Sequence, residues 1–151
     1  MESLDELYHE VILDHFSNPR CKGEMRNPDA SVEVYNPLCG DRVEVMVQVG
    51  DDGTIKDISF EGSGCSISQA SASMMAEICE GLALDDVVKL YDMFDHLVKK
   101  GREGYSEEEL EELGDALALE GVRKFPARIR CAVLAWEALR EALSKARGGA
   151  S

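Results

Sequence analysis

The chain has 151 residues, of which 44% are hydrophobic and 30% charged, and its formal net charge at pH 7 is -14. A chain of this length can form one domain over residues 1–151, since it buries enough surface to fold without disulfide bonds. The excess of Asp and Glu argues against nucleic acid as a partner, because Lys and Arg are the residues that bind a phosphate backbone.

The sequence also bears on compartment and redox state. It has no charged-then-apolar leader and no apolar run long enough to span a bilayer, so we expect a cytoplasmic protein that is neither secreted nor inserted in a membrane. Its five cysteines are odd in number. Without an export signal they are better interpreted as thiols for metal binding or catalysis than as a disulfide framework.

The N-terminal part of the chain predicts one helix and then a small sheet. The amphipathic helix ends before Asn18-Pro19, and a loop follows. Strands are expected at residues 32–35, 42–49 and 54–60, of which the second is the clearest, because its valines alternate with polar or longer side chains. Glycine and aspartate at residues 50–53 favour a hairpin turn, so the sheet should be antiparallel.

The chain after Cys65 predicts helices. Apolar residues recur at helical spacing in residues 67–78, 84–98 and 129–143. Between them, residues 107–120 hold seven acids and no base, after a capping box begun by Ser106, and predict a short solvated helix. Strands followed by helices predict an α+β domain, with a three-stranded antiparallel sheet and helices packed on one face.

The C-terminal residues 123–147 contain seven basic side chains against two acids, in a protein that is otherwise strongly acidic. They are either a solvated helix face balanced by the acidic segment or a docking surface for an acidic patch on a partner. The sequence leaves both interpretations open.

Two short segments between elements combine glycine with possible metal ligands. Gly40 lets the backbone turn so that Cys39 and Asp41 can converge on one metal ion, although a turn with an ordinary Asx hydrogen bond would look the same. Cys65 follows Gly64 at a predicted helix N-terminus, where unpaired N–H groups favour a thiolate. The alternative for that segment is a tight contact between helix and sheet.

The third candidate thiol is Cys131, at or near the start of the last helix. Arg128 and Arg130 flank it, and arginine near a thiol lowers its pKa and offsets the negative charge of a thiolate cluster. Three sulfurs and one oxygen suit zinc, and thiolates also suit iron–sulfur clusters. Spacing alone leaves a shared site and separate structural roles equally open, because no CxxC pair is present.

The remaining cysteines and the histidines give no comparable signal. Cys21 lies in the early loop, Cys79 lies next to an apolar stripe, and we expect both to be structural. The histidines are predicted to be exposed or hydrogen-bonded rather than catalytic, and they are His9, His15 and His96.

Four blocks of sequence, in this order, carry a family resemblance. They are Asp14-His15-Phe16 with Asn18-Pro19-Arg20, then Asn36-Pro37-Leu38-Cys39-Gly40-Asp41, then Gly62-Ser63-Gly64-Cys65, then Arg130-Cys131. Over nearly its whole length the chain resembles the U-type iron–sulfur cluster assembly proteins, the IscU/SufU family. The resemblance implies a SufE/NifU-like α+β fold and maps the family's metal ligands onto Cys39, Asp41, Cys65 and Cys131.

Two departures set the chain apart from the IscU branch. That branch has a histidine before the last cysteine and a Pro-Val-Lys segment that an Hsp70-type chaperone binds; Arg130 and Pro126-Ala127-Arg128 stand at those places here. Binding of this chaperone is therefore not expected. Residues 101–121 resemble an insertion that is typical of the SufU branch. Resemblance to that branch implies a zinc-dependent sulfur acceptor.

The resemblance favours one function over two others. It implies that the protein takes persulfide sulfur at Cys39, or at Cys131 as the second candidate, from a cysteine desulfurase of the SufS or IscS type. Zinc, or alternatively iron or a transient iron–sulfur cluster, would be the cofactor, and downstream assembly machinery would receive the sulfur. A partner side chain could displace Cys39 from the metal and free its thiolate.

The alternatives use the same residues. The first is a scaffold on which a [2Fe-2S]-type cluster is built on Cys39, Cys65 and Cys131 and then donated. The second is a structural zinc module that only binds a partner. Enzymatic activity is at most that of a zinc-dependent persulfide transferase.

Overall fold

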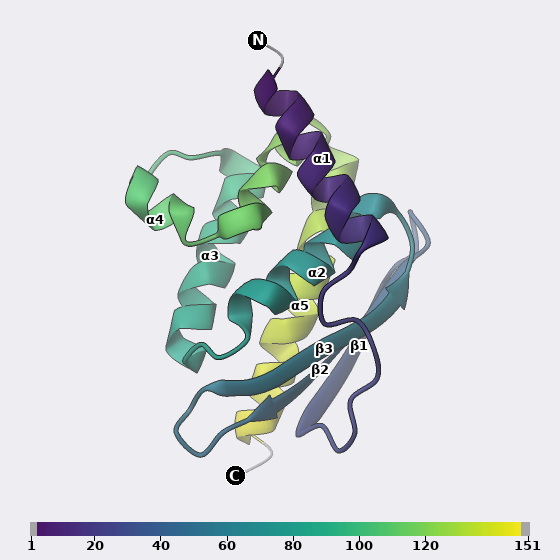
Figure 1. Cartoon of the computed structure of the whole chain (residues 1–151), viewed down its shortest axis with the longest axis vertical. Helices are drawn as coiled ribbons and strands as arrows, with labels where there is room; N and C mark the ends of the chain where they lie inside the picture. Colours follow the sequence, from purple (N-terminus) through teal and green to yellow (C-terminus); the bar gives the residue numbers. More distant parts are fainter. Residues whose placement is uncertain (1–2, 149–151) are drawn as a thin grey trace.

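The computed structural model describes residues 3–148, which form an α+β fold of one sheet and several helices (Figure 1). In chain order the elements are α1 (Ser3–Ser17), β1 (Ala30–Asn36), β2 (Asp41–Val49), β3 (Ile55–Ser63), α2 (Ser66–Cys79), α3 (Leu84–Lys100), α4 (Glu107–Glu111), the 3-10 helix η1 (Gly114–Lys124) and α5 (Pro126–Gly148).

The sheet is antiparallel, with strand order β1-β2-β3, as the hairpin signal predicted. Val43, Val45 and Val47 are completely buried on β2, so the period-two pattern does mark the face that meets the helices. β1 extends beyond both of its predicted ends, and ladder pairing continues to Asp41 on β2 and to Ser63 on β3, whereas β3 begins one residue later than predicted. These extensions bring both strand ends to the candidate site.

The helices cover one face of the sheet, as predicted (Figure 1). α5 packs across β1 and β2, while α2 packs on β3 and beside α5. Large apolar side chains fill the space between these layers, and the rings of Phe94 and Trp136 stack with centroids 4.7 Å apart. α1 lies against α2 and η1.

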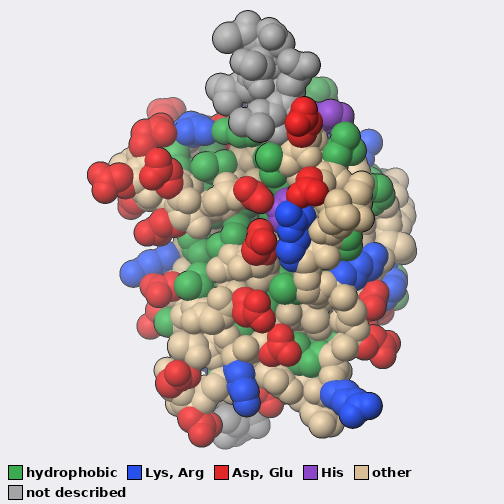
Figure 2. Space-filling model, viewed as in Figure 1, with side chains coloured by type: hydrophobic (Ala, Val, Ile, Leu, Met, Phe, Trp, Pro, Cys, Tyr) green, Lys and Arg blue, Asp and Glu red, His purple; other side chains and the backbone are tan. Residues whose placement is uncertain are grey.

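The acidic segment differs from its prediction. α4 does begin with the predicted capping box between Ser106 and Glu109, and acidic side chains gather over this helix in Figure 2. The acids that follow are mostly exposed, but apolar side chains three residues apart form a buried row that runs from α4 along η1. A period of three matches the three residues per turn of a 3-10 helix. The row consists of Leu110, Leu113, Ala116, Leu119 and Val122.

Within residues 3–148, none of the helices combines the length and apolar character needed to cross a membrane.

Candidate metal centre

A tight turn between β1 and β2 positions the first two candidate ligands. The Asn36 carbonyl accepts hydrogen bonds from the amides of Cys39 (3.2 Å) and Gly40 (2.9 Å), and Gly40 has a φ of 72°, which glycine adopts without strain. The turn leaves Cys39 exposed and buries Asp41, which is only 1% exposed. The turn therefore supplies the site with one exposed thiol and one buried carboxylate.

Cys65 is the N-cap of α2, as its position before the helix predicted. Its Sγ accepts a hydrogen bond from the Ser68 amide at 3.4 Å, and the Ser68 hydroxyl donates to the Cys65 carbonyl at 3.1 Å. The Cys65 amide in turn donates to Asp41 Oδ1 at 2.8 Å. Gly64 makes this approach possible, since it has a φ of 143° and a Cβ there would clash with the Asp41 carboxylate.

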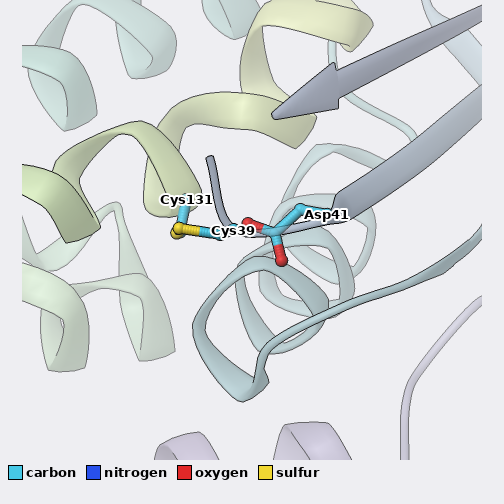
Figure 3. Close-up of side chains that lie close together, drawn as sticks. All are labelled: Cys39, Asp41 and Cys131. Atoms are coloured by element: carbon cyan, nitrogen blue, oxygen red, sulfur yellow. The ribbon is translucent and has the colours of Figure 1, made fainter. Parts of the chain in front are cut away.

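Cys131 lies in the second turn of α5, because the helix begins at Pro126. Its side chain is buried, and its Sγ lies 3.4 Å from the Cys39 Sγ. Figure 3 shows the side chains of Cys131 and Cys39 close together. The side-chain amide of Asn36 also donates a hydrogen bond to the Cys131 sulfur, at 3.7 Å. α5 thus brings in a thiol that is 92 positions from Cys39 along the chain.

The donor atoms of Cys39, Asp41 and Cys131 lie within 4.8 Å of one another. Cys65 is outside this group of three, but its thiol lies close enough to Asp41 and Cys131 to influence the pKa of both. The structure therefore brings all four predicted ligands to one end of the sheet, with Cys65 at the edge of the cluster.

The surroundings of the buried Asp41 carboxylate favour its charged form. Burial alone would raise its pKa, but the hydrogen bond from the Cys65 amide, and then the nearby side chains of Cys131, Cys65 and Ser68, hold the pKa below its ordinary value. Its second oxygen, Oδ2, is buried and has no hydrogen-bond partner. A buried anionic oxygen without a donor fits a cation at this point.

The Cys131 thiol has a raised pKa, contrary to the expectation that flanking arginines would lower it. Burial contributes most, and the neighbouring Asp41, Cys39 and Cys65 side chains add to it. Arg128 lies beside the cluster, where Cys65 and Cys131 raise the pKa of its guanidinium. Arg130 instead forms an ion pair with Glu137 at 2.9 Å along the helix. Only one of the two predicted arginines therefore faces the thiols.

The donor set fits zinc. Two sulfurs bound to one tetrahedral zinc at about 2.3 Å lie about 3.8 Å apart, close to the 3.4 Å between Cys39 and Cys131. Three thiolates with one carboxylate also have the soft character that zinc and iron–sulfur clusters share. The raised pKa of Cys131 means that a metal would have to displace its proton on binding.

The other cysteines and histidines lie away from these four side chains. Cys79 is completely buried, and burial raises its pKa to about 12, in line with a structural role. Cys21 is partly buried with a φ of 62°, and its carbonyl accepts from the Phe60 amide. His15 is buried and hydrogen-bonded to Ser73 and Asp115.

Two residues that support the site carried no predicted role. Asn36 shapes the turn and contacts Cys131, and Ser68 holds Cys65 through two hydrogen bonds. Local signals existed for both. Asn before Pro is typical of a turn, and a serine three residues after an N-cap sits where its amide bonds the capping side chain.

The sequence matches the NifU-like N-terminal domain over residues 7–132. The chain belongs to this family. The NifU-like match spans all four candidate ligands, so the predicted membership among U-type assembly proteins is confirmed.

Relatives within the NifU-like family cover almost the full chain. The zinc-dependent sulfurtransferase SufU of Bacillus subtilis is 42% identical over 97% of this chain and 96% of its own. The iron–sulfur cluster assembly scaffold protein IscU of Streptococcus pyogenes is 40% identical over 96% of this chain and 87% of its own. Both branches weighed from the sequence are thus represented.

Solved structures confirm the NifU-like fold. The N-terminal part of a NifU-like protein from Brucella abortus superposes with a TM-score of 0.83 at 27% identity, covering 95% of this chain and 96% of that chain. A putative SUF-system scaffold protein from Fervidobacterium islandicum gives 0.79 at 29% identity, covering 89% and 94%.

Proposed function

We propose that this protein accepts sulfur from a cysteine desulfurase in iron–sulfur cluster assembly, with zinc held by Cys39, Asp41, Cys65 and Cys131. The observation that carries the proposal is that Cys39 is exposed while its sulfur lies 3.4 Å from the buried Cys131 sulfur. An exposed thiol can reach a persulfide on a partner. The name of the Bacillus subtilis relative, a zinc-dependent sulfurtransferase, supports the same reaction.

The transfer is a thiol–persulfide exchange at Cys39. Its thiolate attacks the terminal sulfur of the desulfurase persulfide, and the bond between that sulfur and the desulfurase cysteine breaks. The desulfurase cysteine leaves as a thiolate and Cys39 becomes the persulfide, so there is no net oxidation. Bound zinc would keep its cysteine ligands deprotonated at neutral pH.

The surrounding residues serve this exchange in different ways. The Asn36 turn presents Cys39 to solvent, and Arg128 supplies positive charge beside an otherwise anionic cluster. Asp41 and Cys65, which are linked by a hydrogen bond, stay on the protein side of the site. A persulfide on Cys39 would then be available to the downstream assembly machinery.

The decisive experiment measures turnover of the cognate cysteine desulfurase with catalytic amounts of the zinc-loaded protein. We expect strong stimulation by wild type, none by Cys39→Ala, and normal stimulation by the matched control Cys21→Ala, whose thiol lies outside the cluster. Normal stimulation by Cys39→Ala with none by Cys131→Ala would make Cys131 the acceptor. No stimulation by wild type would refute the proposal.

The scaffold function is the second candidate, and the names of the IscU relatives from Streptococcus pyogenes and Thermotoga maritima favour it. It would use the same thiols as cluster ligands. Anaerobic reconstitution followed by absorption and Mössbauer spectroscopy separates the two functions, since a sulfur acceptor should yield no stable cluster that can be transferred to another protein.

A further inference from the structure

A groove with a volume of about 920 Å³ lies next to the candidate metal centre. Its walls come from α1, the first turn of α2, η1 and the start of α5. Ile12, Ile67 and Phe125 provide apolar surface in it. Among the side chains that line the groove, the sulfur-transfer proposal gives a role to Arg128 alone.

The groove is basic within an acidic protein. Four of its five Lys, Arg, Asp and Glu side chains are positive, whereas the whole chain has a net charge of -14. Arg102 is neutralised by Glu120, at 2.7 Å. Among the residues that the structure describes, Arg123, Lys124 and Arg128 form no salt bridge, and all three are exposed. Their charge is available to a partner.

An aromatic side chain lies among these charges. Phe125 is 62% exposed and directly follows Arg123 and Lys124 in the chain. Large apolar side chains that are exposed beside a groove are typical of binding surfaces, where aromatic residues contribute much of the affinity. An apolar anchor on a partner could pack against Phe125 while acidic neighbours meet the basic side chains.

The groove is continuous with the metal centre. Ser66, which lines the groove, directly follows the candidate ligand Cys65 in the chain. Arg128 lines the groove and also lies beside the thiols. A segment bound there would hold its protein close to Cys39. This proximity matches a sulfur donor better than a partner with no chemical role.

We propose that the groove binds an acidic segment with an apolar anchor on the desulfurase that donates sulfur, a proposal that rests on the function proposed above. Charge complementarity selects this occupant. An acidic segment is repelled by most of this protein's surface and attracted at the groove, so the interaction also orients the donor toward the metal centre.

The test measures the affinity of the zinc-loaded protein for the cognate desulfurase by calorimetry at low and high salt. We expect the charge-reversal variant Arg123→Glu/Lys124→Glu to bind about tenfold more weakly or worse at low salt, because like charges then face each other. The difference from wild type should shrink in about 1 M salt, where charges are screened. Phe125→Ala should weaken binding at both salt concentrations, because it removes apolar contact.

The matched control is Lys145→Glu/Arg147→Glu, which makes the same charge change on exposed residues at the other end of α5. It should bind the desulfurase like wild type. Wild-type affinity of the groove variant, or an equal loss of affinity in the control, would overturn the proposal.

A second reaction separates docking from chemistry. Cysteine persulfide, a small donor that needs no docking surface, should load Cys39 equally in wild type and in the Arg123→Glu/Lys124→Glu variant. Loss of this reaction in the variant would show that the groove residues act in transfer and not in docking, and would overturn the inference. Desulfurase binding through the groove without sulfur on Cys39 would refute the proposed function and leave the groove as a docking surface.

Discussion

Gly64 determines how closely the β3–α2 connection approaches Asp41. Its φ of 143° lies where side chains other than glycine are strained, and a Cβ there would clash with the carboxylate that the Cys65 amide binds. The sequence identified Gly64 as part of a motif. The physical reason for glycine at this position became evident only from the contact with Asp41.

Replacing Gly64 by alanine should therefore impair metal binding. We expect Gly64→Ala to lower zinc affinity about 10–100-fold, as changes around a metal ligand commonly do, because Asp41 must move. A competition titration with a chromophoric chelator measures the zinc affinity. Gly53→Ala is the control: Gly53 also has a positive φ of 80°, but no atom lies within 4 Å of its Cβ position. Equal affinities of the two variants would refute the steric argument.

At the scale of elements, His15 connects three helices. Its imidazole is completely buried on α1 and hydrogen-bonds to Ser73 on α2 and to Asp115 on η1, both at 2.8 Å. Ser73 also accepts from the Arg20 amide, so the loop after α1 joins the same network. These contacts give His15, the central residue of the Asp14-His15-Phe16 block, a structural role.

Removing the imidazole should loosen this helix contact. We expect His15→Ala to lower the free energy of unfolding by about 2 kcal/mol or more, since two hydrogen bonds are lost and a cavity forms. Urea denaturation followed by circular dichroism measures the change. His9→Ala, at an exposed position on the same helix, should stay within about 0.5 kcal/mol of wild type. A similarly small effect of His15→Ala would contradict a stabilising role.

At the scale of the molecule, the core and the candidate metal centre are distinct. The largest buried side chains, among them Phe60, Phe94 and Trp136, pack between the sheet and α2, α3 and α5. The four candidate ligands lie at one end of the sheet instead. We therefore expect the core to fold without a metal, unlike small zinc domains.

Chelation should leave the protein folded but less stable. We expect metal-free protein to keep its far-ultraviolet circular dichroism at 25 °C and to melt about 5–10 °C lower than protein with free zinc at 100 times its Kd, a linkage of about 2.7 kcal/mol. Differential scanning calorimetry with and without zinc measures the shift. Complete unfolding on chelation would favour the structural zinc module over the sulfur acceptor.

Local patterns determined most of the secondary structure. Alternating valines predicted β2, the glycine and aspartate turn predicted the hairpin, and Ser106 predicted the start of α4. Each signal depends on residues close together in the chain. The 3-10 segment was missed, because the surrounding acids suggested solvation although its apolar residues recur every three positions.

By itself, then, the sequence determined the fold class, most of the elements and the family, because periodicity, capping and motif order are local properties of the chain. Only the tertiary structure decided that Arg128 and not Arg130 faces the thiols, and that burial raises the pKa of Cys131 despite its arginine neighbours. The angular position of each arginine around α5 determines which of them faces the thiols. The packing of α5 on the sheet determines how deeply Cys131 is buried. Both arise from contacts between residues that are far apart in the chain.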